Sequence, residues 1–453
     1  MTMVHRWGAA PLLMVLTVVL SAALVLEPQA WLGILMLPAL LAAALLGRGI
    51  FHNSKPATYT MIFIAVFIID ATSRLREYND KGIDYQVMAK ILVWLTILLI
   101  SLIHARRWLP HMLRPTNIPL LMFMAWLLFT ATVSPVPAYT IATVSSIAIY
   151  LLFCATIFAT FDRTEVLAVM ALSMTALCIV SIVVYFTVPE LGRFIYWVDG
   201  HRYTSLRLSG VGGSANNMGR LAAFGLILVI LYAREFRRFH RWFVPLSSVI
   251  LGVSVLMTNS RGCIAMVAAL WAAVYLFRWH RLYLLIFVVS VLVLGALVAI
   301  PAGDEVLKMI SRSGDAREVT SITGRSTIWQ SIPGLLELRP WTGHGYASSI
   351  VFLPQQERAV GFLTTHAHNL ALQLLLTSGW IGFGLFCLTL ISVGFRLAYF
   401  GDRTGLVLLA FVVFNGITEA SAFSTFANIC TVAFAIAVTL PPEHQYYENN
   451  YSH

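Results

Sequence analysis

Apolar stretches long enough to cross a bilayer recur along almost the whole chain. A membrane-spanning helix needs roughly 17–25 predominantly apolar residues, and we place such stretches at approximately 9–26, 30–46, 57–73, 86–104, 117–134, 139–160, 164–188, 214–233, 242–258, 261–277, 281–300, 379–400, 404–420 and 423–440. The pattern predicts an all-α polytopic membrane protein with about twelve to fourteen spans. The lower number applies if some of the stretches are re-entrant.

The remaining sequence divides the chain into four parts. Residues 1–300 contain about eleven of the expected spans, and residues 301–378 form the only long hydrophilic stretch, with a partly helical segment expected around 322–337. Residues 379–440 contain the last spans, and residues 441–453 are a polar tail that we expect to be disordered. The composition agrees, because 59% of residues are hydrophobic and 11% are charged, against about 45–50% and about 25% in soluble domains.

Basic residues alternate between the connections. With the N-terminus in the cytoplasm, every inner connection is rich in arginine and nearly free of acids, which is typical of cytoplasmic loops. Both termini are therefore expected in the cytoplasm, and segments 189–213 and 301–378 on the outer side. The outer segments are basic as well, against the orientation rule, so their arginines need another reason. The net charge of +10 is not concentrated in any soluble stretch, which argues against nucleic acid as a partner.

Few ionisable residues fall within the expected spans. Asp70, Lys90, Arg220 and Glu419 do, and Arg261 stands at the start of a span. Ionisable side chains inside membranes are rare and often functional, and all of these lie near the outer end of a span. Asp70 and Lys90 are equally well explained as a helix–helix salt bridge. A transporter would more often place charges at mid-depth, so the distribution favours a site that faces the outer side of an inner membrane.

Arginines stand beside several expected helix starts on the outer side. In "RLSGVGGSANNMGRLA", residues 207–222, Arg207 and Arg220 bracket a helix start that also contains Asn216 and Asn217. Helix N-termini and arginine forks both favour phosphate oxygens. Taken singly, each arginine is explained equally well as an interface anchor. Arg261 and Arg325 repeat the arrangement, and no carboxylate cluster accompanies them, so we expect arginines rather than a metal to neutralise a lipid diphosphate.

Two histidines and an asparagine precede the long apolar run after residue 369. In "HAHNLALQLLLTSGWIGFG", His366 and His368 differ by two positions, so they do not form a helical zinc pair. Either Asn369 or His368 could cap the helix. The functional alternative is that a neutral imidazole removes a proton from a sugar hydroxyl. The sequence "TSGWIGFG" would then turn the chain from a short surface helix into the next span. His344, in "RPWTGHGYAS", is a weaker candidate, because a structural turn explains it better.

These segments together resemble the O-antigen ligase and O-antigen polymerase superfamily of bacterial inner-membrane glycosyltransferases. The resemblance runs from about Arg207 to about Gly384 and rests on "RLSG…NN", "SRG", "GR…W", "GHGY" and "HNLALQLLLTSGWIG". It implies a GT-C-type fold and a metal-independent, inverting transfer from undecaprenyl diphosphate without a cofactor. By motif position, His368 corresponds to the catalytic base of the family. Arg207 and Arg261 correspond to its essential arginines.

The acceptor is the point on which the sequence leaves alternatives. Lipid A–core as acceptor makes the chain an O-antigen ligase in lipopolysaccharide biosynthesis, which we prefer. A polymerase that extends the glycan on its lipid diphosphate is the next alternative, and a protein O-glycosylating enzyme is the third. The alternative from another class is a transporter of lipid-linked glycans, which would tolerate His368→Ala.

Overall fold

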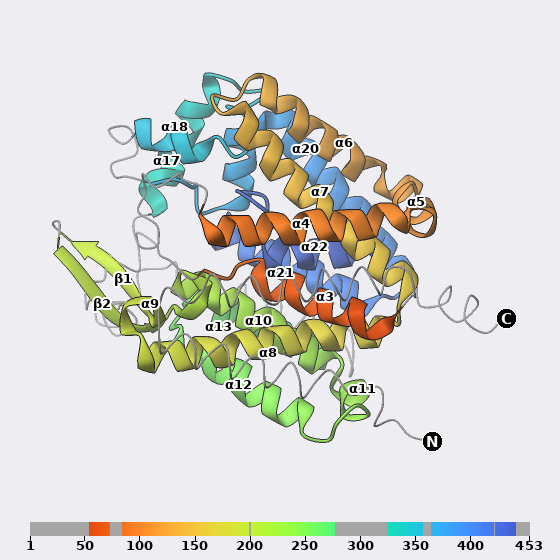
Figure 1. The fold of residues 1–453 in the computed structure, drawn as a ribbon. Helices are drawn as coiled ribbons and strands as arrows, with labels where there is room; N and C mark the ends of the chain where they lie inside the picture. The colour runs from red at the N-terminus through yellow and green to blue at the C-terminus, as the bar shows by residue number, and fades with distance from the viewer. Residues whose placement is uncertain are drawn as a thin grey trace. The chain divides into compact units, whose positions relative to one another are not determined.

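The computed structural model describes residues 54–72, 84–198, 201–276, 325–356, 364–420 and 422–440. Two strands and many helices make up this part of the chain (Figure 1): α3 (Lys55–Ile68), α4 (Tyr85–Ile103), α5 (Ala105–Met112), α6 (Ile118–Phe129), α7 (Pro137–Thr160), α8 (Arg163–Thr187), α9 (Pro189–Gly192), β1 (Arg193–Val198), β2 (His201–Leu208), α10 (Ala215–Leu231), α11 (Ala233–Arg237), α12 (Phe243–Met257), α13 (Arg261–Leu276), α17 (Arg325–Glu337), α18 (Ser349–Gln355), α20 (Leu370–Tyr399), α21 (Arg403–Thr418) and α22 (Ile429–Thr439). The expected spans at 9–26, 30–46 and 281–300, the stretch 301–324 and the tail 441–453 lie outside the described residues.

Within the described residues, five helical segments are long and apolar enough to cross a membrane: Tyr85–Ile103, Pro115–Thr132, Pro137–Thr160, Arg163–Thr187 and Leu370–Tyr399. Shorter apolar helices account for the other expected spans that fall on described residues. The prediction of a mainly helical membrane protein is therefore confirmed. One boundary is wrong: the last span was expected from residue 423, but α22 begins at Ile429, where Asn428 caps it.

A β-hairpin departs from the all-helical prediction. Strands β1 and β2 pair antiparallel with Arg193 opposite Leu208 and Ile195 opposite Thr204, and Figure 1 shows the hairpin beside α9. Aromatic and β-branched residues, which favour strands, make up most of β1, and β2 contains Tyr203 and Thr204. Only the pair Asp-Gly stands between the two strands. Asp-Gly is a strong sequence signal for a tight hairpin turn. The hairpin places Arg207 near the end of its second strand.

The chain divides into two compact units. The first unit comprises Met1–Leu113, Ile149–Val267 and Ala427–His453. Helix α8 is buried along most of its length, with α3, α10 and α12 packed against it. Gly225 allows close packing, because a Cβ there would lie 2.7 Å from Cβ of Met174 on α8. Small residues at such contacts let membrane helices approach closely.

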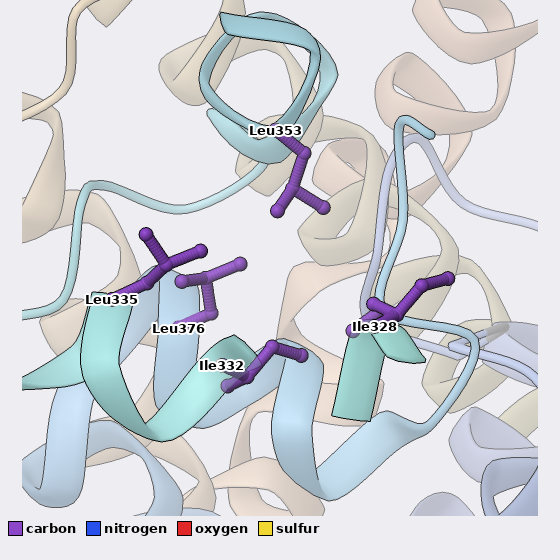
Figure 2. Packing of buried hydrophobic residues seen from close by; sticks show 6 residues of the cluster. Ile328, Ile332, Leu335, Leu353 and Leu376 are labelled. Atoms are coloured by element: carbon purple, nitrogen blue, oxygen red, sulfur yellow. The ribbon is translucent and has the colours of Figure 1, made fainter. Parts of the chain in front are cut away.

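The second unit comprises Arg114–Ala148 and Ala268–Phe426. Helices α6 and α21 pack on α20, and the rings of Phe123, Phe386 and Phe423 meet there at centroid distances between 5.3 and 5.5 Å. A separate apolar cluster joins α17 and α18 to the first part of α20. Figure 2 shows its side chains, and its buried members are Ile328, Ile332, Leu335, Leu353, Ala367 and Leu376. This cluster fixes the described part of the hydrophilic segment against α20.

Candidate active site

The histidine-containing loop ends at a capped helix. The Oδ1 atom of Asn369 accepts a hydrogen bond from the backbone N–H of Leu372 at 3.0 Å, so Asn369 is the N-cap of α20. The cap predicted from the sequence is therefore assigned to Asn369. His368 has a φ of 49°, a left-handed conformation that is uncommon for residues with a Cβ. Such outliers cluster at functional sites.

His368 contacts a carboxylate that the sequence analysis did not assign to the site. The Nδ1 atom of His368 lies 3.1 Å from Oε2 of Glu419. The Nη2 atom of Arg325 donates to the other carboxylate oxygen, Oε1, at 2.6 Å. About 33% of the His368 side chain is exposed, against 17% for Glu419 and 16% for Arg325. The carboxylate is thus shielded between two cationic or hydrogen-donating groups, while the imidazole remains accessible.

Each member of this group of three comes from a different helix end. Arg325 begins α17, His368 precedes α20, and Glu419 is the C-cap of α21. The amide of Asn369 joins two of these ends, because its Nδ2 atom donates to the carbonyl of Ile417 at 3.0 Å. Asn369 therefore both caps α20 and holds it to the end of α21.

The contact with Glu419 determines what His368 can do chemically. A carboxylate only accepts hydrogen bonds, so the proton of a neutral His368 resides on Nδ1. The Nε2 atom then carries the lone pair. A histidine held in this way is suited to general base catalysis, with the carboxylate orienting the ring and stabilising the imidazolium that forms.

A second polar group lies in the first unit, around the start of α10. The Nε atom of Arg207 donates to the carbonyl of Thr258 at 2.9 Å, and its Nη2 donates to Oδ1 of Asn216 at 2.9 Å. The guanidinium carbon also lies 5.1 Å from the ring centroid of Phe194. Arg220 lies on α10, about one helical turn after Asn216, and its Nη2 atom donates to Oδ1 of Asn217 at 3.0 Å. Arginine and asparagine side chains that the sequence placed near this helix start are therefore in contact.

Arg261 is the first residue of α13, as the sequence predicted. It stands three positions after Thr258, the residue whose carbonyl accepts from Arg207. The hairpin, the end of α12 and the start of α10 are linked by the contacts of Arg207. This arrangement could present cationic groups to an anion. The roles of Arg207, Arg220 and Arg261 stay predictions.

Helix α20 bends at a glycine, as the sequence analysis expected of "TSGWIGFG". Gly379 has φ 66° and ψ −172°, which breaks the helical hydrogen bonding. The segment "RPWTGHGYAS" pairs with the backbone groups released there: the N–H of His344 donates to Leu376 O at 2.9 Å, and the N–H of Trp380 donates to Pro340 O at 2.8 Å. The segments "RPWTGHGYAS" and "TSGWIGFG" therefore form one bend region, which sets the direction of the end of α20 that follows His368.

The side chain of His344 is part of this bend region. It is 7% exposed, donates from Nε2 to the carbonyl of Leu335 at 2.9 Å, and stacks on Phe352 with 3.9 Å between ring centroids. Burial lowers the pKa of His344 below its usual value. These contacts agree with the structural explanation that the sequence analysis preferred.

His366, the extra histidine, is partly exposed. Its backbone carbonyl accepts from Thr364 Oγ1 at 2.9 Å, and its ring centroid lies 6.5 Å from that of His368. Across the described ranges, no three His, Cys, Asp or Glu side chains are grouped so as to hold a metal ion.

The family model described as O-antigen ligase matches residues 246–387, and no curated protein matches the chain. The matched segment contains His368, Arg325 and Arg261, whereas Arg207 and Glu419 lie outside it. Residues 246–387 of this chain are therefore similar to the O-antigen ligase family.

Proposed function

We propose that this protein is an O-antigen ligase that transfers a glycan from undecaprenyl diphosphate to lipid A–core. The family supports a function of the O-antigen ligase or polymerase type. The observation that carries the proposal further is the contact between His368 and Glu419, with Arg325 on the other carboxylate oxygen. The enzyme would act in the bacterial inner membrane, with both termini in the cytoplasm and this site facing the periplasm.

The proposed reaction begins at the acceptor hydroxyl. The Nε2 atom of His368 removes the hydroxyl proton while the oxygen attacks the anomeric carbon of the glycan. The new carbon–oxygen bond forms as the bond to the diphosphate breaks, and attack from the opposite face inverts the anomeric configuration. The imidazolium is stabilised by Glu419, as a carboxylate stabilises it in hydrolase triads, and later releases its proton to the leaving diphosphate or to water.

Arginines have two roles in this proposal. Arg207 and Arg261, with Arg220, bind the diphosphate and stabilise the negative charge that grows on it, where fixed charges contribute most to the rate. Arg325 was proposed for the same task. Its contact of 2.6 Å with Glu419 supports a different one, which is to hold that carboxylate in place beside His368.

The experiment supplies purified protein, in detergent with EDTA, with undecaprenyl-diphosphate glycan and lipid A–core. If wild type and His366→Ala transfer glycan to lipid A–core and His368→Ala does not, the result supports the ligase. Lipid A–core that stays unmodified while the lipid-linked glycan lengthens shows a polymerase instead. If no acceptor is glycosylated and the glycolipid crosses a liposome bilayer, the chain is a transporter and the proposal is refuted.

A further inference from the structure

The residue before His368 has both of its backbone polar groups bound by side chains. The N–H of Ala367 donates to Oε1 of Gln373 at 2.9 Å, and the carbonyl of Ala367 accepts from Nε1 of Trp329 at 2.9 Å. Ala367 is fully buried. Buried backbone groups must be paired, but here both partners are side chains from two different helices, so the loop is held by specific residues.

Gln373 is fixed in one orientation. It is fully buried, and its Nε2 atom donates to Oγ of Ser349 on α18 at 2.8 Å. Because the amide NH₂ is directed at Ser349, the amide oxygen is the end that faces the N–H of Ala367. Gln373 also lies one helical turn after the N-cap residue Asn369, whose carbonyl accepts from the Gln373 N–H at 2.9 Å.

Trp329 couples the same loop to Arg325. The two residues are four positions apart on α17, so they lie on one face of that helix. From this face, Arg325 contacts Glu419 and Trp329 contacts Ala367. Helix α17 therefore fixes both members of the histidine–carboxylate pair at once.

The backbone of His368 needs such restraint. A φ of 49° is disfavoured for a residue with a Cβ, and it persists where surrounding contacts over-determine it. If the contacts of Ala367 were lost, the backbone at His368 would relax toward an extended conformation. The imidazole would then turn away from Glu419.

We propose that Gln373 and Trp329 are positioning residues, which hold Ala367 so that His368 keeps its left-handed backbone and its contact with Glu419. This inference rests on the proposed function, in which His368 is the base. Neither residue touches the reacting atoms. Their loss should therefore lower the rate of the chemical step without weakening the binding of the lipid diphosphate.

The test compares Trp329→Phe, which removes the indole N–H together with one ring of the side chain, with Trp341→Phe, which removes the same atoms at another position. Trp341 lies in the same hydrophilic segment but is 65% exposed. We expect kcat to fall about 10- to 100-fold in Trp329→Phe, with the KM for the donor unchanged. This loss is no larger than the lower end of the roughly 10²–10⁴-fold that base catalysis contributes, because the base is displaced and not removed. Gln373→Leu should behave like Trp329→Phe. Gln373→Glu should recover much of the rate, because its carboxyl group can still accept from Ala367.

Two results would overturn the inference. One is a kcat of Trp329→Phe equal to that of Trp341→Phe. The other is a fall in the kcat of Gln373→Leu that is accompanied by a lower thermal unfolding midpoint and is not reversed in Gln373→Glu. That result would indicate a purely structural role for Gln373.

Hydrogen exchange of the backbone separates this inference from the proposed function. The amides of residues 366–369 should exchange at least several-fold faster in Gln373→Leu than in wild type, whatever reaction the protein catalyses. If wild type transfers no glycan but exchange rises in this way, the proposed function fails while the restraint on the loop stands. Unchanged exchange overturns the restraint itself.

Discussion

Replacing Glu419 with glutamine should switch the proton of His368 to the wrong nitrogen. Arg325 can only donate hydrogen bonds, so it binds the oxygen of the new amide and leaves the NH₂ group facing Nδ1 of His368, where the carboxylate oxygen now lies at 3.1 Å. Nδ1 must then accept, and the proton moves to Nε2. An imidazole protonated on Nε2 cannot remove a proton from the acceptor.

The size of the loss follows from this geometry. General base catalysis contributes typically about 10²–10⁴-fold, which corresponds to about 2.7–5.4 kcal/mol of activation free energy at 1.36 kcal/mol per decade. We expect kcat of Glu419→Gln to fall within that range and the KM for the donor to stay within about twofold. Glu337→Gln is the matched control, because Glu337 ends α17 and is exposed.

The assay measures initial rates of glycan transfer by purified protein, with saturating acceptor. A second variant checks the stated cause. In Arg325→Gln combined with Glu419→Gln, the amide at 419 is free to present its oxygen to His368, so the double variant should be faster than Glu419→Gln alone. Activity of Glu419→Gln within threefold of wild type would refute the reasoning. A double variant slower than the single one would instead indicate that Arg325 binds the diphosphate.

Three further outcomes can be checked. Burial lowers the pKa of His344, so at low pH the unfolded chain binds a proton at this side chain that the folded chain does not bind. The thermal unfolding midpoint should therefore drop as pH falls below about 6.5. The drop should be smaller in His344→Gln, and an equal drop in wild type and His344→Gln would contradict this reasoning. Gly379→Ala should destabilise the protein by at least about 1–3 kcal/mol, since a Cβ would lie 2.3 Å from the Trp341 carbonyl. The control Gly384→Ala, with nothing within 4 Å, should not lower the unfolding midpoint. Arg207→Lys should raise the KM for the donor at least about tenfold, because lysine cannot reproduce the planar guanidinium that donates to Thr258 and Asn216. Arg193→Lys should leave this KM unchanged, and a similar KM in both variants would remove Arg207 from the diphosphate site.

Local sequence signals predicted much of the fold and, at the histidine site, the positions of His368 and Asn369 before a helix. Apolar length located each span that falls on described residues, and "SGWIG" located the bend at Gly379. Asn369 could be predicted as a cap, because its side chain acts on a backbone group three residues away. The hairpin was not predicted, although an Asp-Gly pair between two short segments is a signal for a tight hairpin turn.

The partners of His368 could not be derived from the sequence in the same way. Glu419 lies 51 residues from His368 and 94 residues from Arg325, and no periodic pattern relates positions so far apart. The available signal was that Glu419 is an ionisable residue at the outer end of an apolar run, a placement that membrane proteins seldom tolerate without a function. Packing of α17, α20 and α21 is what brings the three side chains together.

The most direct test of the account is the rate of glycan transfer by His368→Ala, measured together with the affinity of that variant for undecaprenyl-diphosphate glycan. The account predicts that transfer falls at least about 10²-fold while the dissociation constant of the donor changes by less than about threefold, because His368 acts on the acceptor proton and not on the diphosphate. Transfer that continues at the wild-type rate would contradict the assignment of His368 as the base.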